Sequence, residues 1–122
     1  MTRARQALGL DGEEAAAHHL EAGGWRILAR RFRAAGHEID LVATRDGVVA
    51  LVEVKTRRAG GVAPTALAVD WRKRRRIATA AQVAALRWGR SARVLRFDVI
   101  TVESGLAGTT VEHIENAFRL GE

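Results

Sequence analysis

Residues 37–57 read HEIDLVATRDGVVALVEVKTR, and this stretch decides the fold. At its centre, Asp46-Gly47 favours a two-residue β-turn, because both central residues of such a turn need a positive φ. Mostly apolar residues flank the turn on both sides, as strands that meet at such a turn do. We therefore predict a β-hairpin in which Arg45 lies opposite Val48.

The alternation of side chains along the two expected strands separates two faces. One face is wholly apolar and should pack on a core; its members are Ile39, Leu41, Ala43, Val48, Ala50, Val52 and Val54. At the open end of the hairpin, the other face places Asp40 opposite Glu53 and Glu38 opposite Lys55. Two directly opposed carboxylates repel each other across a strand pair. Lys55 is one candidate to offset this repulsion, and a divalent cation bound by carboxylate oxygens is a better one.

Length and composition indicate a single domain, 1–122, because 122 residues with 48% hydrophobic residues can form one core. The chain has no cysteine, which excludes disulfides and thiolate metal sites. No segment is long and apolar enough for a signal peptide or membrane span, so we expect a cytoplasmic protein without a membrane partner. The net charge of +6 favours nucleic acid weakly, since 18 of the 20 basic residues are arginine, a bias that a GC-rich genome also produces.

Outside the hairpin, apolar periodicity and turn residues predict the remaining elements. We expect a basic arm or ragged helix start at 1–8, a helix from residue 11 or 12 to about 22, and a helix from about residue 66 or 70 to 88. Strands are expected at about 25–32, 93–102 and 109–114. Residues 58–65 should form a connector or a mobile flap, and the connector is slightly favoured. The tail at 115–122 offers Phe118 and Leu120 for docking. Arg96 and Asp98 share one strand face and could pair with each other, with a structural role favoured over a functional one.

Charged residues on the two expected helices each have two interpretations. If Leu20 marks the buried face of the first helix, Glu13 points inward, where a carboxylate needs a partner or a metal ion. Alternatively, Glu13 only complements the positive end of the helix dipole. In the second helix, residues 72–76 are five consecutive cations, which suit either a solvated face or contact with phosphates. Lys73 shares the apolar stripe of that helix and either reaches toward the sheet or snorkels.

The carboxylates of the hairpin suit metal-assisted phosphodiester hydrolysis. Asp40 and Glu53 would hold one or two divalent cations, Mg²⁺ or Mn²⁺, with Glu13 as a further ligand directly or through water. Lys55 would orient the attacking water or stabilise the charge that develops on the phosphate. The sequence shows no serine or cysteine nucleophile with a nearby base, no zinc pattern among its histidines and no glycine-rich phosphate loop.

These residues carry a resemblance to known families. Asp40 followed by Glu53-Val54-Lys55 resembles the PD-(D/E)XK motif of restriction-endonuclease-like nucleases, and the helix with Glu13 is similar to that of archaeal-type Holliday junction resolvases. The whole chain most closely resembles the small bacterial YraN-like family, through the stretches 12–16 (GEEAA), 38–42 (EIDLV), 52–57 (VEVKTR), 68–70 (AVD) with Lys73, and 96–99 (RFDV). The chain departs from the family pattern at Arg31, where Asn is usual, and at His37, where Gly is usual.

The resemblance implies an α/β fold with a central mixed sheet of about five strands flanked by helices in the order αβββαβ. It also implies a metal-dependent DNA endonuclease, acting in repair or on particular DNA structures. The alternative is a nucleic-acid-binding module of the same fold with weak or no catalysis, acting within a larger complex. DNA is the expected partner, and a homodimer is considered because so small a nuclease has little surface for two strands. The residues expected to contact nucleic acid are Arg57, Arg72, Lys73, Arg74, Arg75 and Arg76.

Overall fold

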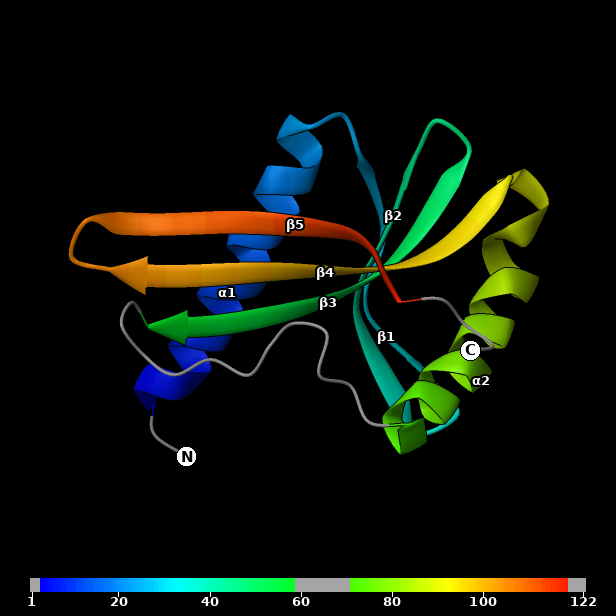
Figure 1. The fold of residues 1–122 in the computed structure, drawn as a ribbon, viewed down its shortest axis with the longest axis horizontal. Coiled ribbons are helices and arrows are strands. Elements are labelled where there is room, and N and C mark those ends of the chain that lie inside the picture. The colour runs from blue at the N-terminus through cyan, green and yellow to red at the C-terminus, as the bar shows by residue number, and fades with distance from the viewer. Residues whose placement is uncertain (1–2, 59–70, 119–122) are drawn as a thin grey trace.

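The computed structural model describes residues 3–58 and 71–118; within these ranges, the side chains of residues 3–11, 71–74, 91 and 118 are not part of the description (Figure 1). Eight elements follow one another along the chain: α1 (Arg3–Ala22), β1 (Arg26–Ala34), β2 (His37–Arg45), β3 (Val48–Arg58), α2 (Trp71–Trp88), η1 (Gly89–Ser91), β4 (Val94–Gly105) and β5 (Gly108–Phe118). The expected connector or flap beyond Arg58, and Leu120, lie outside the described residues.

The five strands form one mixed sheet in the order β1-β2-β3-β4-β5. Neighbouring strands are antiparallel except β3 and β4, which are parallel because α2 lies between them in the chain. This confirms the predicted α/β class, the five-stranded mixed sheet and the order αβββαβ, to which β5 adds an edge strand. Figure 1 shows that β1 and β2 run steeply across the direction of β3, β4 and β5.

The predicted hairpin is confirmed at its turn, where Asp46 and Gly47 have φ values of 51° and 78°. The hydrogen-bonded register between β2 and β3 starts at Arg45↔Val48, as predicted, and extends only to Leu41↔Val52. The expected pairs Asp40–Glu53 and Glu38–Lys55 are not part of this register, which corrects the prediction at the open end of the hairpin. Beyond Leu41, β2 stays paired with β1 as far as Ala34↔His37 and leaves β3.

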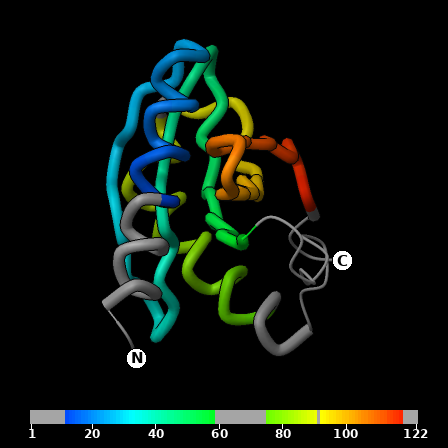
Figure 2. The backbone as a smooth tube through the Cα atoms, turned by 90° about the vertical axis from the view of Figure 1, so that its left-hand side faces the viewer, coloured from blue at the N-terminus to red at the C-terminus, as the bar shows by residue number. Residues whose placement is uncertain are grey.

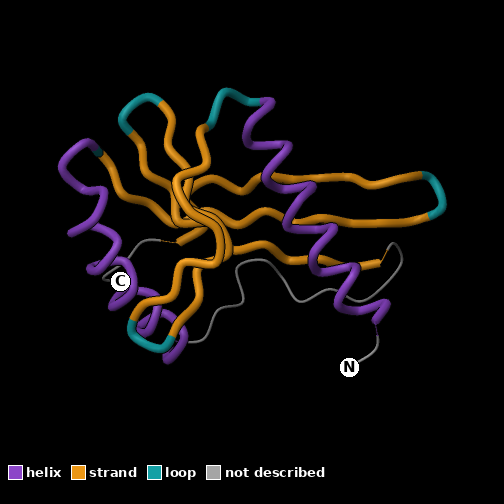
Figure 3. The backbone as a smooth tube through the Cα atoms, turned by 180° about the vertical axis from the view of Figure 1, so that it is seen from behind, coloured by secondary structure: helices purple, strands orange, loops and turns teal. Residues whose placement is uncertain are grey.

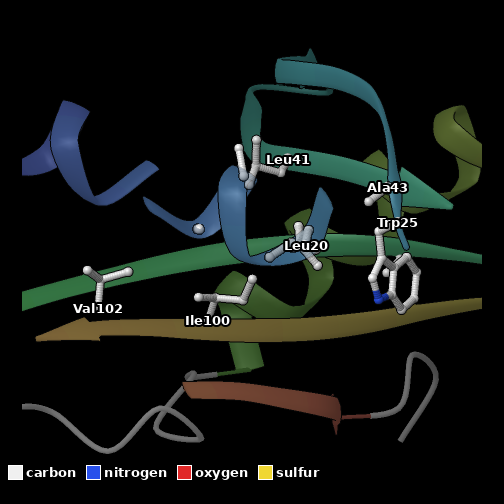
Figure 4. Packing of buried hydrophobic residues seen from close by; sticks show 10 residues of the cluster. Leu20, Trp25, Leu41, Ala43, Ile100 and Val102 are labelled. Carbon is white, nitrogen blue, oxygen red and sulfur yellow. The ribbon is translucent and has the colours of Figure 1, made fainter. Parts of the chain in front are cut away.

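Two hydrophobic clusters lie on opposite faces of the sheet. The face toward α1 buries the side chains of Ala16, Ala17, Leu20, Trp25, Leu41, Ala43, Ala50, Val52, Ile100 and Val102 (Figure 4). The face toward α2 buries Ile39, Val42, Val49, Leu51, Ile77, Ala80, Ala81, Ala84 and Phe97. Figure 3 shows α1 crossing β3, β4 and β5, and Figure 2 shows it alongside the hairpin of β1 and β2, which it also contacts.

The predicted apolar face of the hairpin packs on α1, with one exception. Ile39 belongs to the cluster on the α2 side, whereas Leu41 belongs to the α1 side. The strand therefore changes the direction of its side chains at Asp40. Arg31, which lies between the residues of β1 paired with Ile39 and Leu41, has a φ of 51°. The regular alternation assumed for this strand fails at Asp40, so the sequence pattern alone misplaces Ile39.

Three boundaries also differ from the sequence prediction. α1 begins at Arg3 rather than near residue 11, so residues 3–8 belong to the helix, which agrees with the predicted alternative of a helix start there. β4 and β5 continue to Gly105 and Phe118, well beyond the predicted ends. The register of β4 and β5 shifts between Phe97 and Val99, and Asn116 has a φ of 52°. This irregularity breaks the alternation from which the end of β5 was predicted.

None of the helices in the described part of the chain is long and apolar enough to cross a membrane.

Candidate metal centre

Three carboxylates from two elements converge where β2 leaves β3. Glu13 on α1 and Glu38 and Asp40 on β2 each offer one oxygen, and these oxygens lie within 4.8 Å of one another. Glu13 and Asp40 are partly buried, and Glu38 is exposed. The sequence predicted the meeting of Glu13 with Asp40, and the structure adds Glu38. The signal for Glu38 was its position two residues before Asp40, which places both side chains in the same direction on a regular strand.

The Asp40 carboxylate is held in place by the backbone of β3. Asp40 Oδ2 accepts a hydrogen bond of 2.7 Å from the N–H of Val54. The side chain thus takes the place of a strand carbonyl at the point where β2 and β3 separate. Burial raises the pKa of Asp40 from 3.8 to about 6; the Val54 hydrogen bond opposes this shift, and the charges of Glu13, Glu53 and Glu38 add to it. The positive charge of a bound cation would attract these carboxylates and oppose their mutual repulsion.

Glu53 and Lys55 lie beside this group on β3. Among the described residues, the carboxylates whose oxygens converge within 4.8 Å do not include Glu53, although its charge raises the pKa of Asp40. Glu53 Oε1 lies 3.3 Å from Lys55 Nζ, and Glu53 Oε2 is buried. The side chain of Glu53 is 17% exposed, and that of Lys55 is 34% exposed. Lys55 therefore neutralises part of the charge of Glu53 and presents an ammonium group near the carboxylates.

A close helix–strand contact fixes the position of Glu13. Gly12 on α1 is buried against Thr56 on β3, and a Cβ atom added at Gly12 would lie 1.9 Å from Thr56 Cγ2. Only glycine permits this approach without a shift of one of the two elements. The contact brings the next residue, Glu13, to the edge of the sheet beside Asp40.

Two ion pairs connect α1 with β1 next to the carboxylates. Arg31 Nε donates a hydrogen bond of 3.2 Å to Glu13 Oε2, and Arg30 Nη1 donates one of 2.9 Å to Glu14 Oε2. Glu13 thus lies between a cation and two carboxylates. Nothing in the sequence indicated the role of Arg31, because the pair joins residues far apart in the chain and depends on the left-handed backbone at Arg31.

The residues predicted to contact nucleic acid are only partly described. Arg57 at the end of β3 forms an ion pair of 2.7 Å with Glu103 on β4. Arg75 and Arg76 on α2 are exposed. The side chains of Arg72, Lys73 and Arg74 lie outside the described set, so the interpretation of Lys73 stays a prediction.

A second polar cluster lies on the α1 face of β4. The Asp98 side chain is 0% exposed and accepts hydrogen bonds from Arg96 Nε at 2.9 Å, Arg96 Nη2 at 3.1 Å, His113 Nε2 at 2.7 Å and the Asn116 N–H at 2.9 Å. Arg96 also lies over the Trp25 ring, 5.4 Å from its centroid. The expected Arg96–Asp98 pair is confirmed. It ties the irregular end of β5 to β4 and is saturated with internal contacts, as a structural role requires.

Sequence comparisons place the chain in a family. The sequence profile described as "Uncharacterised protein family UPF0102" matches residues 12–102. A UPF0102 protein of Nitratidesulfovibrio vulgaris (strain DP4) is 40% identical over 125 residues, covering 100% of this chain and 91% of the relative. UPF0102 proteins of Geobacter metallireducens and Trichlorobacter lovleyi are 41% and 44% identical, covering 98% and 97% of this chain and 98% and 94% of their own lengths. The chain belongs to the UPF0102 family, and the matched range contains all the carboxylates of the candidate centre.

Proposed function

We propose that this member of the UPF0102 family hydrolyses phosphodiester bonds of DNA with the help of Mg²⁺ or Mn²⁺, as a nuclease of the PD-(D/E)XK type. The observation that carries the proposal is the convergence of Glu13, Glu38 and Asp40, whose oxygens lie within 4.8 Å of one another. These residues come from a helix and a strand that are distant in sequence. Arg31 pairs with Glu13, and a cation bound between the three carboxylates would relieve the repulsion that remains.

The donors fit a hard divalent cation. All three groups are carboxylates, and oxygen ligands of this kind suit Mg²⁺ and Mn²⁺. The pKa of Asp40 is raised to about 6, chiefly by burial; the charges of Glu13, Glu53 and Glu38 add to this shift, and a bound cation would offset their part of it. Val54 fixes the orientation of Asp40, so one ligand is organised before any cation binds.

The roles of the residues follow from their positions. Glu13, Glu38 and Asp40 would hold the cation, and Glu53 would add negative charge or a water-mediated contact from β3. A bound divalent cation supplies a Lewis acid for the phosphate and a water of lowered pKa. Lys55, which contacts Glu53 at 3.3 Å, is placed to bind the phosphate or orient the attacking water.

The first experiment measures cation binding. Thermal unfolding of the wild-type protein should shift to higher temperature as Mn²⁺ is added, because a ligand of the folded state stabilises it by mass action. Glu13→Gln should lose most of this shift. Glu14→Gln is the matched control, since Glu14 is the next residue of the same helix and its exposed side chain pairs with Arg30 outside the group. The control should retain the wild-type response.

The second experiment tests cleavage. Wild-type protein should cut at least one of linear, single-stranded, flapped or four-way-junction DNA when Mg²⁺ or Mn²⁺ is present. Asp40→Asn and Glu53→Gln should each abolish the activity, and Glu14→Gln should preserve it. Cleavage that persists in both of the first two variants would contradict the assignment. Salt-sensitive DNA binding without cleavage of any substrate would instead identify the non-catalytic binding module.

A further inference from the structure

Arg31 occupies an unusual position beside the candidate metal centre. It lies on β1, an edge strand of the sheet, between Arg30 and Phe32, which pair with the two neighbours of Asp40 on β2. Its φ of 51° is in the left-handed region, which disfavours residues with a Cβ atom other than Asn and Asp. Arg31 stands where the resembled family usually has Asn, a residue that tolerates a positive φ, so the arginine side chain is a feature of this chain that the backbone does not favour.

The guanidinium of Arg31 contacts Glu13, a carboxylate of the candidate centre. Arg31 Nε donates a hydrogen bond of 3.2 Å to Glu13 Oε2. The guanidinium therefore occupies one oxygen of a carboxylate that would bind a metal ion. The Arg31 side chain is 52% exposed, and its contact with Glu13 uses Nε. The planar fork of Nη1 and Nη2 matches the two oxygens of a phosphate, to which arginine binds more strongly than to a single carboxylate oxygen.

We propose that Arg31 makes cation binding at this centre depend on nucleic acid. Without DNA, the guanidinium neutralises Glu13 and competes with the cation; a DNA phosphate at the β1 edge then takes the guanidinium and releases Glu13 to the cation. The inference rests on the proposed function and adds that Arg31 couples the binding of the cation to the binding of DNA. By thermodynamic reciprocity, the cation must then tighten DNA binding by the same factor that DNA tightens cation binding.

A neighbouring ion pair argues against a purely structural role for Arg31. Arg30 and Glu14 already connect β1 with α1 at 2.9 Å, through side chains outside the group of carboxylates. A second connection between the same elements is not needed for that purpose. The two roles also predict opposite changes in cation affinity when the Arg31 side chain is removed. A structural clamp positions Glu13, so its loss weakens cation binding, whereas a competitor withholds Glu13, so its loss strengthens cation binding.

The first arm of the test measures Mn²⁺ binding to protein alone by isothermal titration. Arg31→Asn and Arg31→Gly both suit a positive φ, and Arg30→Asn is the matched control on the same strand. Both Arg31 variants should bind Mn²⁺ about threefold to tenfold more tightly than wild type, the range expected for removing one partly screened cation. Arg30→Asn should stay within about twofold, since its partner Glu14 lies outside the group.

The second arm measures the anisotropy of a short fluorescein-labelled duplex with and without Mn²⁺, with intact duplex confirmed on a gel afterwards. Mn²⁺ should tighten DNA binding by wild type and by Arg30→Asn. The Arg31 variants should lose most of this enhancement, and the slope of their affinity against salt should fall by about one phosphate contact.

The outcomes separate the inference from the proposed function. If wild type binds Mn²⁺ but both folded Arg31 variants bind it equally or more weakly, Arg31 only positions Glu13 and the inference is overturned, while the proposed function stands. If wild type binds no Mn²⁺ either alone or with the duplex, the proposed function fails and the inference fails with it. Tighter Mn²⁺ binding by the Arg31 variants together with lost enhancement supports the inference.

Discussion

Replacing Gly12 by alanine tests the contact that brings α1 to the candidate centre. The new Cβ atom would lie 1.9 Å from Thr56 Cγ2 and 3.3 Å from Thr56 Cβ. Since carbon atoms in contact prefer about 3.5–4.0 Å, the helix or the strand must move by roughly 1.5 Å. Overpacking of this kind costs about 1–3 kcal/mol, and the gain in helix propensity from glycine to alanine returns about 1 kcal/mol. We expect Gly12→Ala to lower the free energy of unfolding by up to about 2 kcal/mol.

A second substitution isolates this contact. Thr56→Ser removes Cγ2, the atom in conflict, and keeps the Cβ and the hydroxyl group. In that background, Gly12→Ala should be close to neutral, because the contact at 1.9 Å is gone and the propensity gain of up to about 1 kcal/mol is opposed by the remaining 3.3 Å approach to Thr56 Cβ. The two substitutions should therefore be coupled by up to about 2 kcal/mol in a double-mutant cycle. Gly89→Ala is the control, because its Cβ would meet Ala85 at an ordinary 3.7 Å.

Urea unfolding of the four proteins in the cycle gives the coupling energy, and Mn²⁺ titration of the same proteins reports on Glu13. Gly12→Ala should weaken Mn²⁺ binding, since the displaced helix carries Glu13 away from Asp40, and Thr56→Ser should restore it in the double variant. If the destabilisation of the double variant equals the sum of the two single effects within about 0.5 kcal/mol, the close contact between α1 and β3 is refuted.

Two further perturbations address the buried carboxylates. Because the pKa of Asp40 is raised from 3.8 to about 6, the folded state binds more protons than the unfolded state, so stability should fall as pH rises through that window. Urea unfolding across the window should show a loss of about 1–2 kcal/mol after solvent screening, and Asp40→Asn should remove it. Asp98→Asn should cost about 3 kcal/mol, because it leaves the guanidinium of Arg96 without its carboxylate. Burial raises the pKa of Asp98, but hydrogen bonds from His113, Arg96 and Asn116 outweigh it and lower that pKa, so this stabilisation is present above the unfolded pKa and lost as pH falls through the folded value.

Local signals in the sequence were sufficient for the regular parts of the fold. Asp46-Gly47 determines its own turn, because both residues tolerate a positive φ and the sequence around them leaves few alternatives. The apolar positions of the hairpin then fix the register near the turn, since a slip of one residue would expose the core face. The meeting of Glu13 and Asp40 was predictable because one residue lies on the inward face of a helix and the other on a neighbouring strand.

The irregular parts depended on contacts between distant residues. The side-chain direction of β2 changes at Asp40, opposite the left-handed Arg31, and arginine gives no local warning of such a conformation. Asn116 similarly interrupts β5, where its N–H binds Asp98, a residue 18 positions earlier in the chain. Periodicity detects only regular elements, so both the end of β5 and the separation of β2 from β3 beyond Leu41 were beyond its reach.

Asp40 lies at the point where β2 separates from β3. Two substitutions of Asp40 distinguish its contribution to the fold from its contribution to function. Asp40 accepts the Val54 N–H that a continuous strand pair would satisfy with a carbonyl. Asp40→Asn retains an acceptor oxygen and removes a charge that repels Glu13, so it should keep or slightly raise the stability of the protein without metal. Asp40→Ala should cost about 1–3 kcal/mol, because it leaves a partly buried donor unsatisfied. Both variants should lose the Mn²⁺ response. Equal stability of the two variants in urea would show that the Val54 contact does not hold the carboxylate, and the preorganisation of the centre by β3 would then be wrong.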